Sequence, residues 1–128
     1  MMLTFTQVEL VTDTDGRARF HERATPLPDG SDAARLSAIA PATGLQFRES
    51  PVGFASPFHC TPKPQWLFIL GGTMEIGLRD GTARTFGPGQ GFLAADTLPE
   101  GATFDDTLHG HRSAQVGPLP LVTLFVKL

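Results

Sequence analysis

Glycine and proline interrupt this chain at short intervals, and this punctuation constrains the fold more than any other feature. The 128 residues include 14 glycines and 11 prolines. The segments between them are short and carry apolar side chains, a pattern typical of strands joined by turns. The sequence therefore predicts an all-β protein, with ten strands over 3–10, 17–24, 45–50, 52–59, 65–70, 74–79, 83–86, 90–95, 109–115 and 120–127.

One segment, residues 25–44, departs from this pattern. Its prolines and an Asp-Gly pair predict loop. Within it, Ser31 is a suitable N-cap for one short helix that runs to Ile39 before Pro41 ends it. We therefore expect an N-terminal extension of strands and loop over residues 1–44, packed on a β domain over 45–128.

Composition excludes several classes of protein. The length fits one domain, and a net charge of −3 argues against a nucleic-acid binder that relies on a basic face. A single cysteine, Cys60, excludes an intramolecular disulfide and a cysteine-rich zinc site. The first residues do not resemble a signal peptide, and the longest apolar run, Trp66 to Leu70, is too short to cross a bilayer. We expect a soluble cytoplasmic protein without a membrane partner.

Two predicted strands are apolar on both faces. In residues 65–70 and in residues 119–126, apolar side chains occupy both odd and even positions. In a strand half exposed to water, apolar and polar side chains would alternate. One face is expected to pack on the core. The other is covered either by the chain itself or by a second subunit, and we expect a homodimer in which the N-terminal strands are candidates to cross to the partner.

Many sandwiches and barrels share these features, but one motif narrows the choice. Gly53 is followed at fixed spacings by His59, Thr61, Gln65 and Gly72. This resembles the first signature of the cupin superfamily, which reads G, five residues, H-x-H, three or four residues, E, six residues, G. Both glycines, the first histidine and the spacings match. Thr61 and Gln65 stand where the family has its second histidine and its glutamate.

The turns that follow extend the resemblance to about residue 126. Asp80-Gly81 is a hairpin signal, in which both turn residues are expected at positive φ. Gly87-Pro88-Gly89 resembles the turn before the second cupin signature. The resemblance implies a small single-domain cupin: a double-stranded β-helix, or jelly-roll barrel, over residues 45–128. Cupins are commonly dimers, in agreement with the apolar outward face.

In cupins the first signature holds a divalent metal together with a histidine of the second. Counting from the Pro-Gly turn places Glu100 at the position of the second-signature histidine. An insertion over residues 98–108 would restore the spacing of the second signature. The resemblance then assigns the second-signature histidine to His111, with His109 as a further candidate on the same strand face. The implied ligands for Zn, Ni, Mn or Fe are His59, His111 and, more weakly, His109 and Gln65.

Two functions remain open, beside a third option in which the barrel is vestigial and its role is protein association. With Thr61 and Gln65 in place of ligands, the barrel is expected to bind a small polar metabolite, with a weak or lost metal site. Arg48 is either a carboxylate-binding group of that pocket or a surface charge. The alternative is a divalent-metal enzyme of the dioxygenase, isomerase or lyase type, whose ligand set is completed by an acid near the insertion. The candidate acids are Asp96, Glu100, Asp105 and Asp106.

Overall fold

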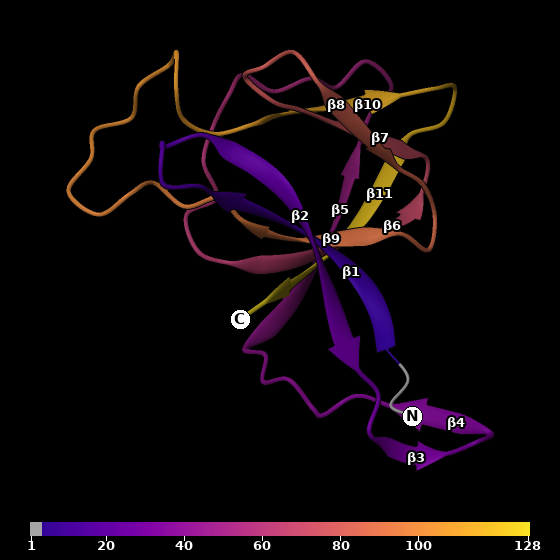
Figure 1. Ribbon diagram of the computed structural model, residues 1–128. Coiled ribbons are helices and arrows are strands. Elements are labelled where there is room, and N and C mark those ends of the chain that lie inside the picture. The colour runs from indigo at the N-terminus through magenta and orange to yellow at the C-terminus, as the bar shows by residue number, and fades with distance from the viewer. Residues whose placement is uncertain (1–3) are drawn as a thin grey trace.

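The computed structural model describes residues 4–128, and these residues form strands and connecting loops without a helix. The larger sheet has six strands in the order β2-β1-β9-β6-β11-β5 (Figure 1). All neighbours are antiparallel except β1 and β9, which are parallel. In this order the strands are β2 (Ala18–Pro26), β1 (Thr4–Thr12), β9 (Gly91–Ala95), β6 (Gln65–Gly71), β11 (Leu121–Lys127) and β5 (Gly44–Ser50).

A smaller sheet lies opposite, with the order β10-β7-β8. Its strands are β10 (Arg112–Val116), β7 (Thr73–Gly77) and β8 (Ala83–Phe86). Two isolated bridges, Ala55 to Ala114 and His59 to His111, lay the segment before β6 along the free edge of β10. Within residues 4–128 the two sheets share no hydrogen-bonded strand pair, so the expected closed barrel is not present.

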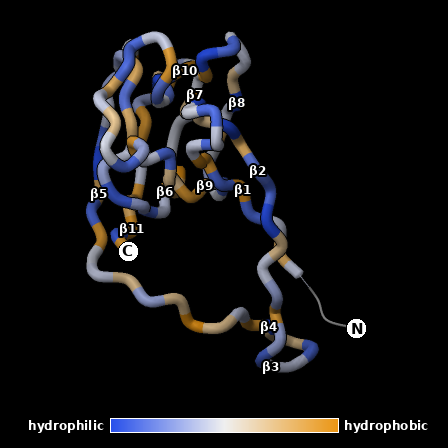
Figure 2. Tube along the Cα trace, turned by 60° about the vertical axis from the view of Figure 1, so that its left-hand side comes forward, coloured by the Kyte–Doolittle hydropathy of each residue, from blue (hydrophilic) through white to orange (hydrophobic). Residues whose placement is uncertain are grey.

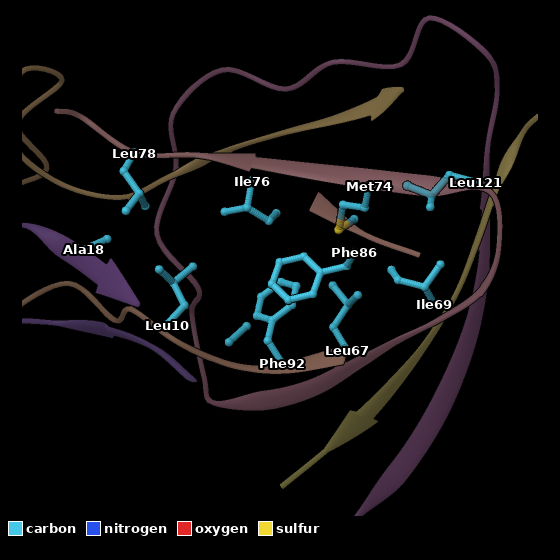
Figure 3. Close-up of a cluster of buried hydrophobic side chains, with 11 residues drawn as sticks. Leu10, Ala18, Leu67, Ile69, Met74, Ile76, Leu78, Phe86, Phe92 and Leu121 are labelled. Carbon is cyan, nitrogen blue, oxygen red and sulfur yellow. The ribbon is translucent and has the colours of Figure 1, made fainter. Parts of the chain in front are cut away.

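The hydrophobic core fills the space between the two sheets. In β7, Met74 and Ile76 are buried while Glu75 between them faces outward, as the alternation of a strand requires. Figure 3 shows these side chains pointing toward Leu67 and Phe92 from the larger sheet. Both sheets thus bury one face against the other. The core also includes Leu10, Ala18, Ile69, Leu78, Phe86, Ala94 and Leu121.

The outer face of the larger sheet remains apolar. Trp66 and Phe68 stack with their ring centroids 5.9 Å apart. Phe47 is 65% exposed and Leu45 62%, and Leu70 is 49% exposed. The described part of the chain therefore does not bury this face, although both parities of β6 and β11 are apolar as the sequence indicated.

The predicted helix over residues 31–39 is wrong. This region forms a hairpin of β3 (Asp29–Ser31) and β4 (Ala34–Leu36), which stands apart from both sheets (Figures 1 and 2). A helix of nine residues is marginal in water unless its apolar face packs on something, and here the segment has no such support. Gly30 adopts a φ of 83°, and a Cβ there would meet the carbonyl of Ala34 at 1.9 Å.

Two other local predictions are corrected. Residues 52–59 do not form a continuous strand; only Ala55 and His59 make bridges, because the prolines around them cannot donate to a ladder. The turn at Asp80-Gly81 is present, but only Gly81 has positive φ. Its amide donates to the carbonyl of Leu78, so the turn is the common form with glycine at its fourth position.

No helix within residues 4–128 has the length and apolar character needed to cross a membrane.

The burial of side chains in the larger sheet predicts how substitutions change the free energy of unfolding. Leu10 is fully buried in β1, whereas Leu119 is 61% exposed in the loop before β11. Leu10→Ala is expected to lower the free energy of unfolding by about 2–5 kcal/mol, because it removes buried methyl groups and leaves a cavity. Leu119→Ala, the matched control, should change it by less than about 0.5 kcal/mol in urea unfolding. Equal effects would contradict the assignment of β1 to the core.

Candidate functional site

Two histidines from distant parts of the chain lie against each other at one end of the smaller sheet. The amide of His59 donates to the carbonyl of His111 at 2.8 Å, and the amide of His111 donates back to His59 at 3.0 Å. Their ring centroids are 4.5 Å apart. The structure therefore brings together the two imidazoles that the sequence singled out first.

Gly110 makes this approach possible. Its φ is 82°, and a Cβ built on it would lie 2.4 Å from the carbonyl oxygen of His59. Only glycine combines that backbone conformation with so close a neighbour. The chain can therefore reach the start of β10 with His111 already paired to His59.

A buried carboxylate orients the ring of His111. Asp96, which directly follows β9, is fully buried, and its Oδ2 lies 2.5 Å from Nδ1 of His111. Its Oδ1 accepts a hydrogen bond from the hydroxyl of Thr61 at 2.7 Å. An ionised carboxylate only accepts, so Nδ1 of His111 carries the hydrogen. The hydroxyl of Thr61 is likewise engaged as a donor.

The ring of His59 has the same tautomer for a different reason. Its Nδ1 lies 2.9 Å from the carbonyl oxygen of Pro57, which can only accept. In both rings Nε2 is therefore the nitrogen with the free lone pair. Among the described residues no buried side-chain nitrogen or oxygen lacks a partner. Nε2 of His111 has no protein partner, so it must be open to solvent.

His59 is exposed at the surface, and both histidines line a small cavity between the sheets. Its volume is about 90 Å³, and the two histidines line it together with Arg48, Thr61 and Gln65. Apolar side chains of both sheets complete the wall, among them Leu67, Met74, Ile76, Phe92 and Phe125. The cavity thus joins a few polar groups to an apolar floor, as small-molecule sites usually do.

Among residues 4–128, the cavity is lined by one cationic side chain, Arg48, and by no carboxylate. The guanidinium of Arg48 lies 4.8 Å from the ring centroid of Phe54. The amide oxygen of Gln65 accepts a hydrogen bond from the Lys127 ammonium. This oxygen is therefore turned toward a cation, which opposes its use as a metal ligand.

Cys60 also lines the cavity. Burial, together with the nearby negative charge of Asp96, raises the pKa of its thiol. A raised pKa keeps the sulfur protonated and weakens it both as a nucleophile and as a metal ligand.

His109 does not reach the cavity, contrary to the expectation that it shares a face with His111. Its Nδ1 accepts a hydrogen bond from the amide of Asp105 at 2.9 Å, and its ring centroid lies 6.1 Å from that of Phe104. The positive φ of Gly110 breaks the strand alternation on which the expectation depended. His109 is therefore a structural residue of the loop.

The acidic insertion does not close over the cavity. Asp106 pairs with Arg79 at 3.2 Å, and Asp105 accepts hydrogen bonds from the amide and hydroxyl of Thr107. These bonds from Thr107 lower the pKa of the Asp105 carboxyl. The insertion packs toward the β1–β2 turn, where the side chain of Leu108 faces Gly16.

Sequence reasoning included Asp96 only as one of four possible ligands and did not predict its bond to His111. The available signal was an acidic residue placed directly after a buried apolar strand, Phe92 to Ala95, where an unpaired carboxylate would be costly.

A comparison of the chain with protein-family models finds no match, and a comparison with the curated proteins finds none either. Across residues 4–128, no three or more side chains of His, Cys, Asp and Glu gather in a way that could hold a metal ion. The site is therefore defined by its own geometry.

Gly110 provides a test of this geometry with a matched control. Gly117 also has a positive φ, but nothing lies within 4 Å of a Cβ built on it. Gly117→Ala should cost about 1–2 kcal/mol for the backbone conformation alone. Gly110→Ala should cost about 1–3 kcal/mol more, because its Cβ displaces the His59 carbonyl.

Urea unfolding of the two variants, with NMR of the imidazole resonances, makes the comparison. Gly110→Ala should also shift the signals of His59 and His111, and Gly117→Ala should not. Equal costs, with unshifted histidines in both variants, would contradict the close approach described here.

Proposed function

We propose that this chain is a binding protein of the cupin type that holds a small polar metabolite between its two sheets, without competent metal chemistry. One observation carries the proposal. His59 and His111 both line one small cavity, and the protein holds their Nδ1 atoms, which leaves each Nε2 available as an acceptor. Two fixed acceptors of this kind suit a ligand that has hydrogen-bond donors.

The arrangement of the strands supports the cupin type of fold. The six-stranded sheet faces a three-stranded one, and the segment around residues 55–59 lies beside β10 as a further, irregular edge. The two glycines of the first signature, Gly53 and Gly72, both adopt positive φ, in agreement with their placement at turns. A jelly roll of two facing sheets accounts for these features.

The small number of available metal ligands explains why metal chemistry is not part of the proposal. Catalytic zinc sites usually have three protein ligands. Here two imidazoles face the cavity, while the hydroxyl of Thr61 donates to Asp96 and the amide oxygen of Gln65 is bonded to Lys127. Two neutral ligands in a cavity that also contains Arg48 hold a divalent cation weakly.

A second candidate function is a divalent-metal-dependent enzyme of the dioxygenase, isomerase or lyase type. The bond between Asp96 and His111 favours it, because metal-binding histidines usually donate their other ring N–H to a carboxylate or carbonyl. In this reading Nε2 of His59 and of His111 would hold Zn, Ni, Mn or Fe. The metal would supply Lewis-acid or oxygen-activating chemistry.

Metal-free protein and NMR of the histidine side chains separate the two functions. Small polar compounds at millimolar concentration are expected to shift the Nε2 signals of His59 and His111 without added metal. His111→Ala and His59→Ala should lose this binding, because each removes one fixed acceptor. His21→Ala is the control, since His21 is exposed and pairs with Asp13 on the outer face.

Two outcomes would contradict the binding proposal. One is that no polar compound in a broad screen shifts either histidine. The other is that elemental analysis of untagged protein finds one tightly held metal ion per chain, lost in both His59→Ala and His111→Ala, which would establish the enzyme reading instead.

A further inference from the structure

We propose that the cavity is selective for a small carboxylate with a hydroxyl on the adjacent carbon, of which glycolate is the simplest example. The carboxylate would pair with Arg48, and the hydroxyl would donate to an imidazole Nε2. This inference rests on the proposed binding function and assigns the chemical class of the ligand.

The charge of Arg48 favours a carboxylate ligand. Six arginines among the described residues have a carboxylate partner: Arg19, Arg23, Arg35, Arg79, Arg84 and Arg112. Within residues 4–128, Arg17 and Arg48 have none, and of these two it is Arg48 that lines the cavity. Its guanidinium lies over the ring of Phe54, which leaves its N–H groups without an acidic acceptor. A carboxylate is the anion that fits this planar group best.

Among residues 4–128, no aspartate or glutamate lines the cavity, so no wall carboxylate competes with that anion for Arg48. The buried carboxylate nearby, Asp96, is already satisfied by Thr61 and His111. The ammonium of Lys127, bonded to Gln65, adds a second positive charge beside the wall. The cavity is thus electrostatically suited to an anion and unsuited to a cation.

The two imidazoles favour a ligand that also has a hydroxyl. Each Nε2 is an acceptor, so it repels a bare carboxylate oxygen and requires a donor from the ligand. A hydroxyl next to the carboxylate supplies that donor. Glycolate supplies one donor to these two acceptors, whereas an acid without a hydroxyl supplies none and should bind more weakly.

The size of the cavity limits the ligand. A cavity of about 150 Å³ can hold benzene, with its six non-hydrogen atoms. By proportion, the 90 Å³ found here holds about four, which covers a carboxylate and its adjacent carbon. Glycolate has about one non-hydrogen atom more than this estimate, so it fills the cavity and reaches its mouth, whereas a sugar or a nucleotide would extend well beyond the mouth.

The test compares glycolate with two matched probes, acetate and the uncharged glycolamide, by NMR titration of metal-free protein. Glycolate should shift His59 and His111, and glycolamide should bind about 10- to 100-fold more weakly because it lacks the charge. Arg48→Gln should abolish the preference for glycolate, and Arg48→Lys should restore part of it. Arg23→Gln, on the opposite edge strand and paired with Glu9, is the control.

The outcomes distinguish this inference from the proposed function. If glycolamide binds as tightly as glycolate, and Arg48→Gln has no effect, the cavity binds polar ligands but the carboxylate assignment is wrong. If acetate matches glycolate, the role given to the hydroxyl is wrong. If the broad screen described above also leaves both histidines unshifted, the proposed function itself fails.

An independent observation supports a second proposal, on how copies of the chain assemble. Every residue from 28 to 49 is exposed, including the β3–β4 hairpin and nearly all of β5. Ile39 is 98% exposed and Leu36 55%. Figure 2 shows this segment looping away from the sheets before it returns to β5. We define residues 28–43 as the arm.

We propose that the partner of this surface is a second copy of the chain, with the arm of each copy lying on the outer face of the other's six-stranded sheet. The area is sufficient. Six exposed apolar side chains on the arm and outer face, at roughly 100 Å² each, give about 1,200 Å² over two copies, the lower bound for a stable interface. They are Phe5, Leu36, Ile39, Leu45, Phe47 and Leu70.

Light scattering of purified full-length protein tests the assembly. The chain should be a dimer at about 10 µM, and Ile39→Glu in the arm or Phe47→Glu on the sheet should each shift it to monomer, because burying an unpaired charge is costly. Leu119→Glu, at a side chain about as exposed as Phe47 but in the loop before β11, should remain a dimer. Circular dichroism confirms that the variants are folded. A wild-type monomer, or a dimer unaffected by Ile39→Glu, would overturn the proposal.

Discussion

The buried hydrogen bond between Asp96 and His111 is the interaction on which the rest of the site depends. A buried carboxylate is very costly unless donors surround it, and here the imidazole and the hydroxyl of Thr61 supply them. The same bond joins the end of β9 to the start of β10, one from each sheet. It therefore fixes the ring of His111 and the spacing of the sheets around the cavity at once.

In each of the two histidines, the two ring nitrogens have different roles. Nδ1 is bonded to the protein, and Nε2 has no hydrogen-bond partner among residues 4–128. His59 reaches the same state through the carbonyl of Pro57 rather than through a charged partner. Arg48, on the edge strand of the other sheet, adds a cation without a protein counterion. The two imidazoles and this positive charge are the basis of the carboxylate site that we propose.

The sequence predicts the all-β class because glycine and proline spacing limits local structure directly. It also selects His59, His111 and Arg48, which the structure places around one cavity. Sequence-based prediction fails where a single backbone angle sets the direction of a side chain. Gly110 at positive φ turns the neighbouring His109 away, and alternation cannot foresee that. The helix expected over residues 31–39 fails because a cap and a proline mark possible helix ends without supplying a surface to pack on.

The tautomers of His59 and His111 test the central claim most directly. Long-range proton–nitrogen NMR of uniformly ¹⁵N-labelled protein, recorded near about pH 8 where histidine is ordinarily neutral, distinguishes the two ring nitrogens. The account predicts that both rings carry the hydrogen on Nδ1 and leave Nε2 unprotonated. A hydrogen on Nε2 of either ring, or rapid exchange between the two forms of His111, would contradict it.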